Sequence, residues 1–221
     1  VNAAGEVFLI VCDGMGGANK GDVASKTAID CLTEAFRKKK KFLFPSFDKM
    51  WFTHACKEAN ATIYNMADKN PSYKGMGTTM VAAFLSGNRL TIANIGDSRA
   101  YLITDTTIKQ MTEDQTYVHF LVQTGKITPE QALTHPERHV LMNALGIYPS
   151  VSLTINQYDY HGEKLLLCSD GLYNQVPEKE IQAIVNTDER ADQKVVSLIC
   201  VANNNGGSDN EGISYWESEH D

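Results

Sequence analysis

Four aspartates lie at the ends of apolar segments or in glycine-rich turns, and they are the residues of this sequence best suited to chemistry. Asp13 ends the apolar run of residues 7–12 and is followed by glycines, and Asp170 ends a second apolar run in the same way. Asp97 ends a third run, and Asp209 lies between glycines and an asparagine. Short apolar runs bounded by glycine are typical of buried strands. The sequence therefore predicts one site to which several strand ends contribute carboxylates.

Clustered carboxylates without histidines at metal-binding spacing favour a hard cation, so Mg²⁺ or Mn²⁺ is expected rather than Zn²⁺. Without a cation the carboxylates would repel one another, and some would stay protonated. Two ions about 3.5–4 Å apart can activate a shared water and hold a phosphoryl group for in-line attack. Hydrolysis of a phosphoester is the reaction that this pattern favours.

One segment imitates another class of phosphatase. Cys31 and Arg37 have the spacing of the C-x5-R signature of cysteine-dependent phosphatases. That chemistry needs a loop whose backbone N–H groups surround phosphate next to a thiolate of low pKa. The segment contains no glycine and has the periodicity of an amphipathic helix with Cys31 on its apolar face, so we interpret the match as coincidence.

Composition excludes several other functions. The formal charge of −7 and the isoelectric point near 5.4 argue against binding to nucleic acid or to an anionic membrane as the main activity. The five cysteines form no C-x-x-C pair, and no apolar run has transmembrane length. We therefore expect a soluble, cytoplasmic protein. A monomer is also expected, although composition does not decide the oligomeric state.

The periodicity predicts the elements that must position the aspartates. Apolar residues recur every three or four positions over 21–36 and over 47–66, which predicts two helices. Strand patterns follow, then a polar and helical insertion, two more strands, two helices and a last strand. The predicted strands span 78–85, 89–95, 98–103, 151–157, 163–168 and 213–216, the insertion spans 114–146, and the later helices span 177–186 and 189–203. Runs of strands separated by helices indicate an α+β protein with helices layered on antiparallel sheets.

Six short motifs occur in order along almost the whole chain. They are Asp13-Gly-Met-Gly-Gly17, Gly21-Asp-Val-Ala-Ser25, Gly75-Met-Gly-Thr-Thr79, Ile95-Gly-Asp-Ser-Arg99, Cys168-Ser-Asp-Gly-Leu172 and Gly207-Ser-Asp-Asn210. In this order they resemble the metal-dependent Ser/Thr protein phosphatases of the PP2C (PPM) type in their bacterial form. The resemblance implies a single domain over 1–221. Its fold would be a four-layer α-β-β-α sandwich of two central antiparallel sheets flanked by helices, with the metal site in the cleft at one edge.

The resemblance also implies a role for each aspartate. Asp13 would bridge two ions, Mn²⁺ or Mg²⁺, and Gly14 would offer its backbone carbonyl to one of them. Asp170 and Asp209 would bind the second ion, and Asp97 with Asp170 would hold a third, weaker one. A metal-bridging hydroxide would attack the phosphorus of phosphoserine or phosphothreonine directly, without a phosphoenzyme. Residues 114–146 would form a flap beside the cleft that tunes substrate access.

Three positions depart from the family pattern. Residues 1–6 contain no arginine, although the family places one before the first strand to meet the substrate phosphate. Met15 stands where eukaryotic relatives carry a histidine proposed as general acid, so metal-bound water would protonate the leaving group. Glu211 and Gly212 separate Asn210 from the expected last strand, as a bulge or a missing piece of chain would.

Two readings of the function follow. The first is a protein phosphatase whose partners are phosphorylated proteins, including a Ser/Thr protein kinase of the same cell and its substrates. The alternative is a catalytically silent module that binds a phosphoprotein or kinase through the same fold. Near the site, Thr78 and Thr79 are expected to satisfy hydrogen bonds beneath it, and Arg99 could equally pair with an internal carboxylate or touch substrate.

Overall fold

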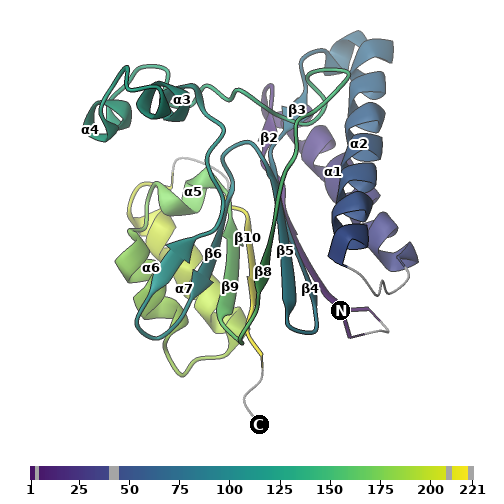
Figure 1. Cartoon of the computed structure of the whole chain (residues 1–221). Helices are drawn as coiled ribbons and strands as arrows, with labels where there is room; N and C mark the ends of the chain where they lie inside the picture. Colours follow the sequence, from purple (N-terminus) through teal and green to yellow (C-terminus); the bar gives the residue numbers. More distant parts are fainter. Residues whose placement is uncertain (3–4, 40–44, 208–210, 219–221) are drawn as a thin grey trace.

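Two antiparallel sheets packed face to face form the centre of the computed structural model, which describes residues 1–2, 5–39, 45–207 and 211–218 (Figure 1). In the described part of the chain the first sheet has the order β1-β4-β5-β8 and the second the order β10-β9-β6-β7. The first comprises β1 (Val7–Val11), β4 (Met80–Ser86), β5 (Arg89–Ile95) and β8 (Thr154–Asp159). The second comprises β10 (Ile213–Trp216), β9 (Lys164–Cys168), β6 (Arg99–Ile103) and β7 (Ile108–Gln110).

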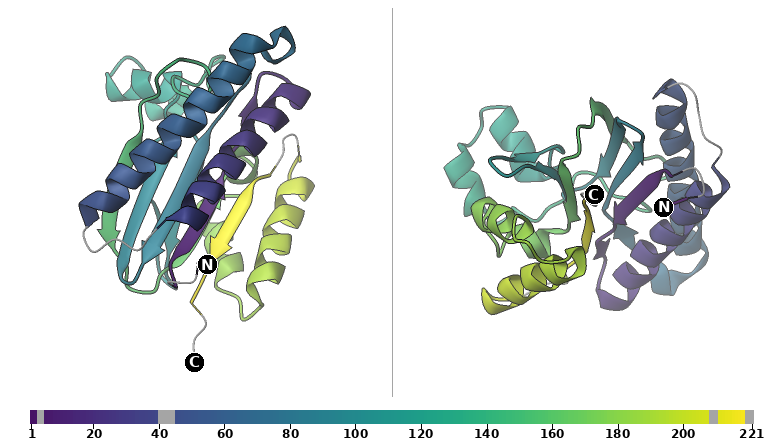
Figure 2. Two further views of the ribbon diagram at one scale, coloured as in Figure 1. Left: turned by 90° about the vertical axis from the view of Figure 1, so that its right-hand side faces the viewer. Right: turned by 90° about the horizontal axis from the view of Figure 1, so that it is seen from below.

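Helices cover the outer face of each sheet (Figure 2). The long pair α1 (Ala18–Lys38) and α2 (Pro45–Lys69) packs on the first sheet. Three others, α5 (Asp170–Tyr173), α6 (Glu178–Val185) and α7 (Ala191–Asn204), pack on the second. This confirms the predicted four-layer α-β-β-α sandwich.

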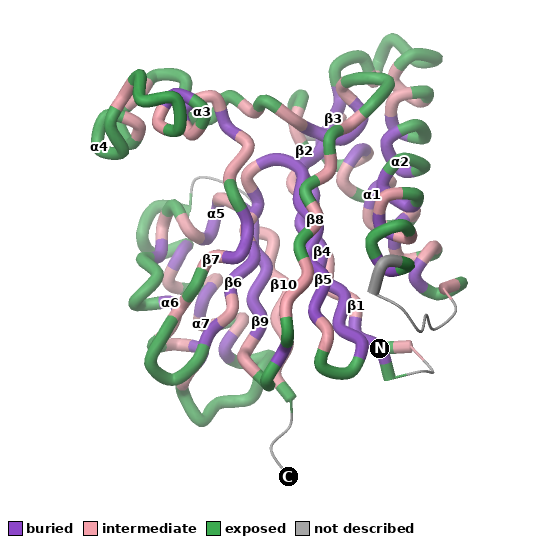
Figure 3. The backbone as a smooth tube through the Cα atoms, in the orientation of Figure 1, coloured by how far each residue is buried: buried purple, intermediate pink, exposed green. Residues whose placement is uncertain are grey.

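The central strands β4 and β9 are largely apolar because both of their faces are buried. In β4, Met80, Ala82 and Phe84 pack against α1 and α2, whereas Val81 and Ala83 face the second sheet. The same alternation along β9 sends every second residue to the helices and the others to the sheet interface. Figure 3 shows these central strands as the most buried part of the molecule. The period of two in side-chain direction thus separates three apolar layers.

A two-stranded ladder and a short turn complete the edge near Asp13. β2 (Gly14–Met15) pairs with β3 (Gly77–Thr78), and the turn η1 (Pro71–Tyr73) lies between α2 and β3. The ladder rests on α1 through two glycines, since a Cβ added to Gly21 would lie 2.6 Å from the carbonyl carbon of Gly14. Any side chain at either glycine would push the helix away from the turn after Asp13.

The insertion at 114–146 leaves the sheets and carries α3 (Tyr117–Gln123) and α4 (Pro129–Leu133) (Figure 1). Thr128 caps α4 in a reciprocal capping box with Gln131, and Pro129 occupies the first turn, which confirms the predicted start of this helix. Most of the insertion is exposed (Figure 3).

One strand prediction was wrong at its boundaries. The strand predicted over 151–157 is β8, which begins at Thr154 and continues to Asp159. Its pairing with β5 stops at Asn94 and Thr154, although β5 continues to Ile95, so residues 151–153 lie outside the ladder. Val151 instead packs against the core under α1 and α2. Strand β7 was not predicted.

Candidate metal centre

The sheet registers bring three of the four aspartates to one edge of the sandwich. Val11 at the end of β1 lies opposite Val81, and Met80 at the start of β4 lies opposite Ile95 at the end of β5. In the second sheet, Arg99 at the start of β6 lies opposite Cys168 at the end of β9. The residues that follow or precede these strand ends, Asp13, Asp97 and Asp170, therefore share this edge.

Asp209 falls outside the described residues. The chain resumes at Glu211, and Gly212 exchanges hydrogen bonds with Ser169: the Gly212 N–H donates to Ser169 Oγ at 2.8 Å, and the Ser169 N–H donates to the Gly212 carbonyl at 2.9 Å. Ile213 then pairs with Cys168. The last strand thus starts at the edge where Asp170 lies.

The backbone of Asp13 is held from below by two threonines. Its N–H donates to Thr79 Oγ1 at 3.0 Å, and its carbonyl accepts from the Thr79 N–H and from Thr78 Oγ1, both at 2.8 Å. Thr79 Oγ1 also hydrogen-bonds Ser98 Oγ at 2.7 Å, which connects Asp13 to the turn that carries Asp97. The two threonines therefore support the site, as predicted, and both of their hydroxyls make hydrogen bonds.

Two adjoining cavities contain the aspartates. A cavity of about 340 Å³ is lined by Asp13, Gly14, Asp22, Ser169 and Glu211, among others. Asp22 projects from α1 into this cavity, and sequence reasoning did not identify it as a site residue. In the sequence, the only indication that Asp22 belongs to the site is its place in the Gly21-Asp-Val-Ala-Ser25 motif. Its place in the same cavity as Asp13 results from the packing of α1 against β2, which the sequence pattern does not contain.

A larger cavity of about 680 Å³ lies between the insertion and α5. Asp97, Asp114 and Asp170 line one end of it, and residues of α3 and α4 line the other. Burial, and then the charges of Asp170 and Asp114, raise the pKa of Asp97 to about 7. Asp114 was not identified from the sequence as part of this site.

The donors at this edge fit a hard divalent cation. They are carboxylate oxygens, with the Gly14 carbonyl on the adjoining turn, and the raised pKa of Asp97 reflects desolvation and repulsion that a bound cation would relieve. Within the described residues no three His, Cys, Asp or Glu side chains are grouped closely enough to hold an ion by themselves. Asp97 and Asp170 line the larger cavity together, and Asp13 lines the smaller one.

Arg99 resolves the alternative left open by the sequence. Its Nε donates to Asp114 Oδ1 at 3.0 Å and its Nη2 to Asp114 Oδ2 at 2.6 Å, so it pairs with an internal carboxylate. Asp114 lies at the start of the insertion. The guanidinium is therefore engaged beside the site.

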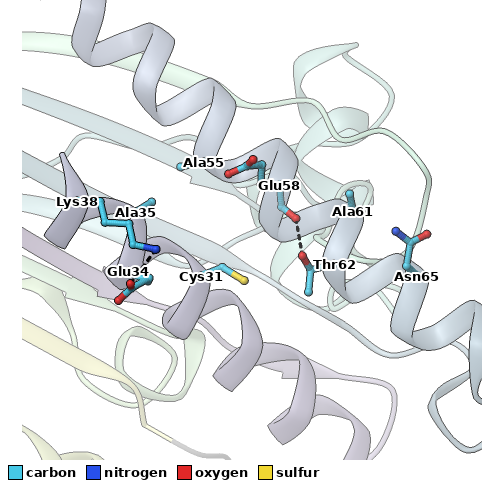
Figure 4. A pocket seen from close by; sticks show the side chains of 9 residues that line it. All are labelled: Cys31, Glu34, Ala35, Lys38, Ala55, Glu58, Ala61, Thr62 and Asn65. Atoms are coloured by element: carbon cyan, nitrogen blue, oxygen red, sulfur yellow. Dashed lines mark hydrogen bonds and ion pairs between the residues drawn. The ribbon is translucent and has the colours of Figure 1, made fainter. Parts of the chain in front are cut away.

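Cys31 has none of the surroundings of a nucleophile. It lies in the groove between α1 and α2, beside Ala35 and opposite Thr62 (Figure 4). Burial raises the pKa of its thiol, the reverse of what nucleophilic catalysis requires. Arg37 is exposed on the same helix, and its Nη1 lies 4.0 Å from Glu34 Oε2. The C-x5-R match is a coincidence of helical sequence.

Comparison with known proteins agrees with the fold. The family model described as protein phosphatase 2C matches residues 1–198. The serine/threonine phosphatase stp of Listeria welshimeri is 39% identical over 210 residues, which cover 95% of this chain and 83% of that protein.

Solved structures superpose closely on this chain. The serine/threonine phosphatase Stp1 of Staphylococcus aureus has a TM-score of 0.89 at 36% identity, with 99% of this chain and 86% of that one covered. The catalytic domain of the phosphatase PstP, in a complex with two manganese ions, has a TM-score of 0.82 at 33% identity, with 94% and 86% covered. With its motifs, its sandwich and its carboxylate edge, this chain belongs to the protein phosphatase 2C family of metal-dependent serine/threonine protein phosphatases.

Proposed function

We propose that this chain hydrolyses phosphoserine and phosphothreonine in proteins at the edge shared by Asp13, Asp97 and Asp170. The observation that carries the proposal is the convergence of these residues, from the ends of both sheets, on two adjoining cavities. Asp13, the Gly14 carbonyl, Asp170 and Asp209 would hold two Mn²⁺ or Mg²⁺ ions. Asp97 with Asp170 would hold a third, weaker one.

The ions, when bound, would supply Lewis acidity toward the phosphoryl group and lower the pKa of water. The protein contributes a rigid frame for their ligands. Thr78 and Thr79 fix the backbone of Asp13, and the close contact of Gly14 with Gly21 fixes the turn that follows it. Preorganised ligands are what this chemistry requires, because the metal site then needs little reorganisation during the reaction.

Residues 114–146 would act as a flap over the larger cavity. Its root is fixed at Gln115, whose side-chain carbonyl accepts from the Gly96 N–H at 3.0 Å and from Asn143 Nδ2 at 2.7 Å. The Gln115 N–H donates to the Gly96 carbonyl at 3.0 Å. The root of the flap is therefore bonded to Gly96, the residue that precedes Asp97. The helices of the flap line the cavity in which a phosphopeptide would lie.

The cellular context is also part of the proposal. The natural partners would be a Ser/Thr protein kinase of the same cell and the proteins that it phosphorylates, and the chain would work as a cytoplasmic monomer. In the described part of the structure, no helix combines the length and the apolar character needed to span a bilayer.

The test is hydrolysis of a phosphothreonine peptide by purified protein with Mn²⁺, with Mg²⁺ and with EDTA. Turnover that requires metal and survives alkylation of the thiols supports the proposal. Asp13→Asn should abolish turnover, whereas Lys26→Gln, a neutralising change on the same helix as Asp22, should not. A folded protein without turnover under any metal would favour the silent binding module.

A further inference from the structure

The guanidinium of Arg99 is held in one orientation next to the Asp97 turn. Besides its two-point pairing with Asp114, it donates from Nη1 to Tyr101 Oη at 3.2 Å. Its side chain is only 22% exposed and that of Asp114 only 17%. Gln110 Nε2 donates to Asp114 Oδ1 at 3.1 Å, which fixes the carboxylate from a second direction.

The ring of Tyr173 lies against the face of this guanidinium. Arg99 Cζ is 3.6 Å from the ring centroid, within the range of a cation–π contact. The phenol hydroxyl donates to the backbone carbonyl of Asp97 at 3.1 Å. Tyr173 and Asp170 belong to the same short helix, α5, so this hydrogen bond connects the helix of Asp170 to the turn of Asp97.

The flanks of Asp97 are anchored by other contacts. Gly96 is fixed by Gln115 on one side, and Ser98 is fixed by Thr79 on the other. The Asp97 carbonyl itself is held by Tyr173. Tyr173 is thus the contact through which α5, which carries Asp170, restrains the backbone of Asp97, and Arg99 stacks on the ring that makes this contact.

We propose that Arg99 and Tyr173 are positioning residues for the Asp97–Asp170 pair. Arg99, locked by Asp114, holds the Tyr173 ring by stacking, and Tyr173 in turn holds the Asp97 carbonyl. The inference rests on the proposed function, in which Asp97 and Asp170 hold the third, weaker ion. Neither residue contacts substrate in this role, and neither is a metal ligand.

The arrangement uses properties that lysine lacks. A guanidinium is planar, binds a carboxylate through two parallel hydrogen bonds and stacks on an aromatic ring, whereas an ammonium is a compact, strongly hydrated charge. Arg99→Lys keeps the charge next to Asp114 but loses the plane that supports the Tyr173 ring. Tyr173→Phe keeps the ring and its stacking and removes only the hydrogen bond to Asp97.

Binding of Mn²⁺ to EDTA-stripped protein tests the proposal without relying on turnover. Calorimetric titration and the Mn²⁺ electron paramagnetic resonance signal together separate tight from weak ions. We expect Tyr173→Phe to weaken the weak class about three- to tenfold, as the loss of one net hydrogen bond implies, and to leave the tight class unchanged. Arg99→Lys should weaken the weak class at least as much.

Tyr160→Phe is the matched control, because it also removes one tyrosine hydroxyl, which donates to the Glu163 carbonyl at 2.7 Å, and leaves the contacts of Arg99 and Asp97 in place. It should bind both classes as the unmodified protein does. Thermal melting of each variant in EDTA verifies that it is folded.

A weak class unchanged in Tyr173→Phe would overturn the proposal, as would equal weakening of both classes in a folded variant. Absence of a tight class in the unmodified protein is a different result. It would contradict the proposed two-metal function, and the positioning role would fall with it.

Discussion

The hydroxyl of Thr79 offers the sharpest test of how the fold holds its metal centre. The side chain is 3% exposed, and its Oγ1 accepts from the Asp13 N–H and hydrogen-bonds Ser98 Oγ, which is 1% exposed. Thr79→Val keeps the shape and removes both hydrogen bonds. Each buried polar group left without a partner costs about 1–3 kcal/mol, and two groups lose theirs, so we expect the free energy of unfolding to fall by about 2–6 kcal/mol.

Thr79→Ser is the control for packing. It keeps the hydroxyl and removes the methyl group that packs against Gly96, where an added Cβ would lie 2.8 Å from Thr79 Cγ2. Loss of one buried methyl group costs about 1 kcal/mol. The difference between valine and serine therefore isolates the hydrogen bonds from the methyl contact.

Urea unfolding followed by circular dichroism measures both variants, in EDTA and in saturating Mn²⁺. In EDTA the valine variant should be the less stable of the two. In Mn²⁺ it should gain less stability than the unmodified protein, because the Asp13 backbone has lost one of its supports and binding stabilises only the correctly formed site. Equal stability of the valine and serine variants in EDTA would refute the reasoning.

Three further predictions concern the carboxylates and the charges buried far from them. Asp13→Asn and Asp170→Asn should each abolish peptide hydrolysis while circular dichroism and thermal melting stay near those of the unmodified protein; a variant that keeps turnover would exclude its residue from the site. Burial, and then neighbouring carboxylates, raise the pKa of Asp97 from 3.8 to about 7 in the metal-free fold. The folded state then holds a proton that the unfolded chain releases, so the free energy of unfolding in EDTA should fall as pH rises between these values, and Asp97→Asn should remove this slope in urea titrations at several pH values. Lys39 Nζ lies 3.4 Å from both Glu6 Oε1 and Asp48 Oδ1, with all three side chains almost fully buried at the opposite end of β1. Lys39→Met should therefore cost about 3–5 kcal/mol in urea unfolding and leave Mn²⁺ affinity unchanged, whereas a loss below about 1 kcal/mol would contradict the expected cost of breaking this buried ion pair.

Local patterns in the sequence predicted the elements and the kind of site. Apolar runs identified β1, β4 and β9, because strands buried on both faces favour apolar residues at successive positions. The Thr128–Pro129 start of α4 was predictable because a helix cap is made by neighbouring residues. The aspartates were identified because each one follows such a run or lies in a glycine-rich turn.

The boundaries of β8 show where this reasoning stops. Val151 and Leu153 are as apolar as strand residues, and both pack against the core under α1 and α2. They are not part of the strand because the pairing of β8 with β5 stops at Thr154 and Asn94, one residue before the end of β5. Strand length is decided by a partner distant in sequence, and the apolar pattern of one segment does not contain that information.

The sequence by itself determined which residue types could bind metal and which strands would deliver them. Only the tertiary structure decided their partners: Asp22 enters the cavity of Asp13, Arg99 pairs with Asp114 rather than substrate, and Tyr173 holds the Asp97 carbonyl. These contacts join segments that are brought together by sheet register and helix packing. A sequence motif records only neighbouring residues, whereas a hydrogen bond of about 3 Å between distant segments forms only when the whole fold places both segments correctly.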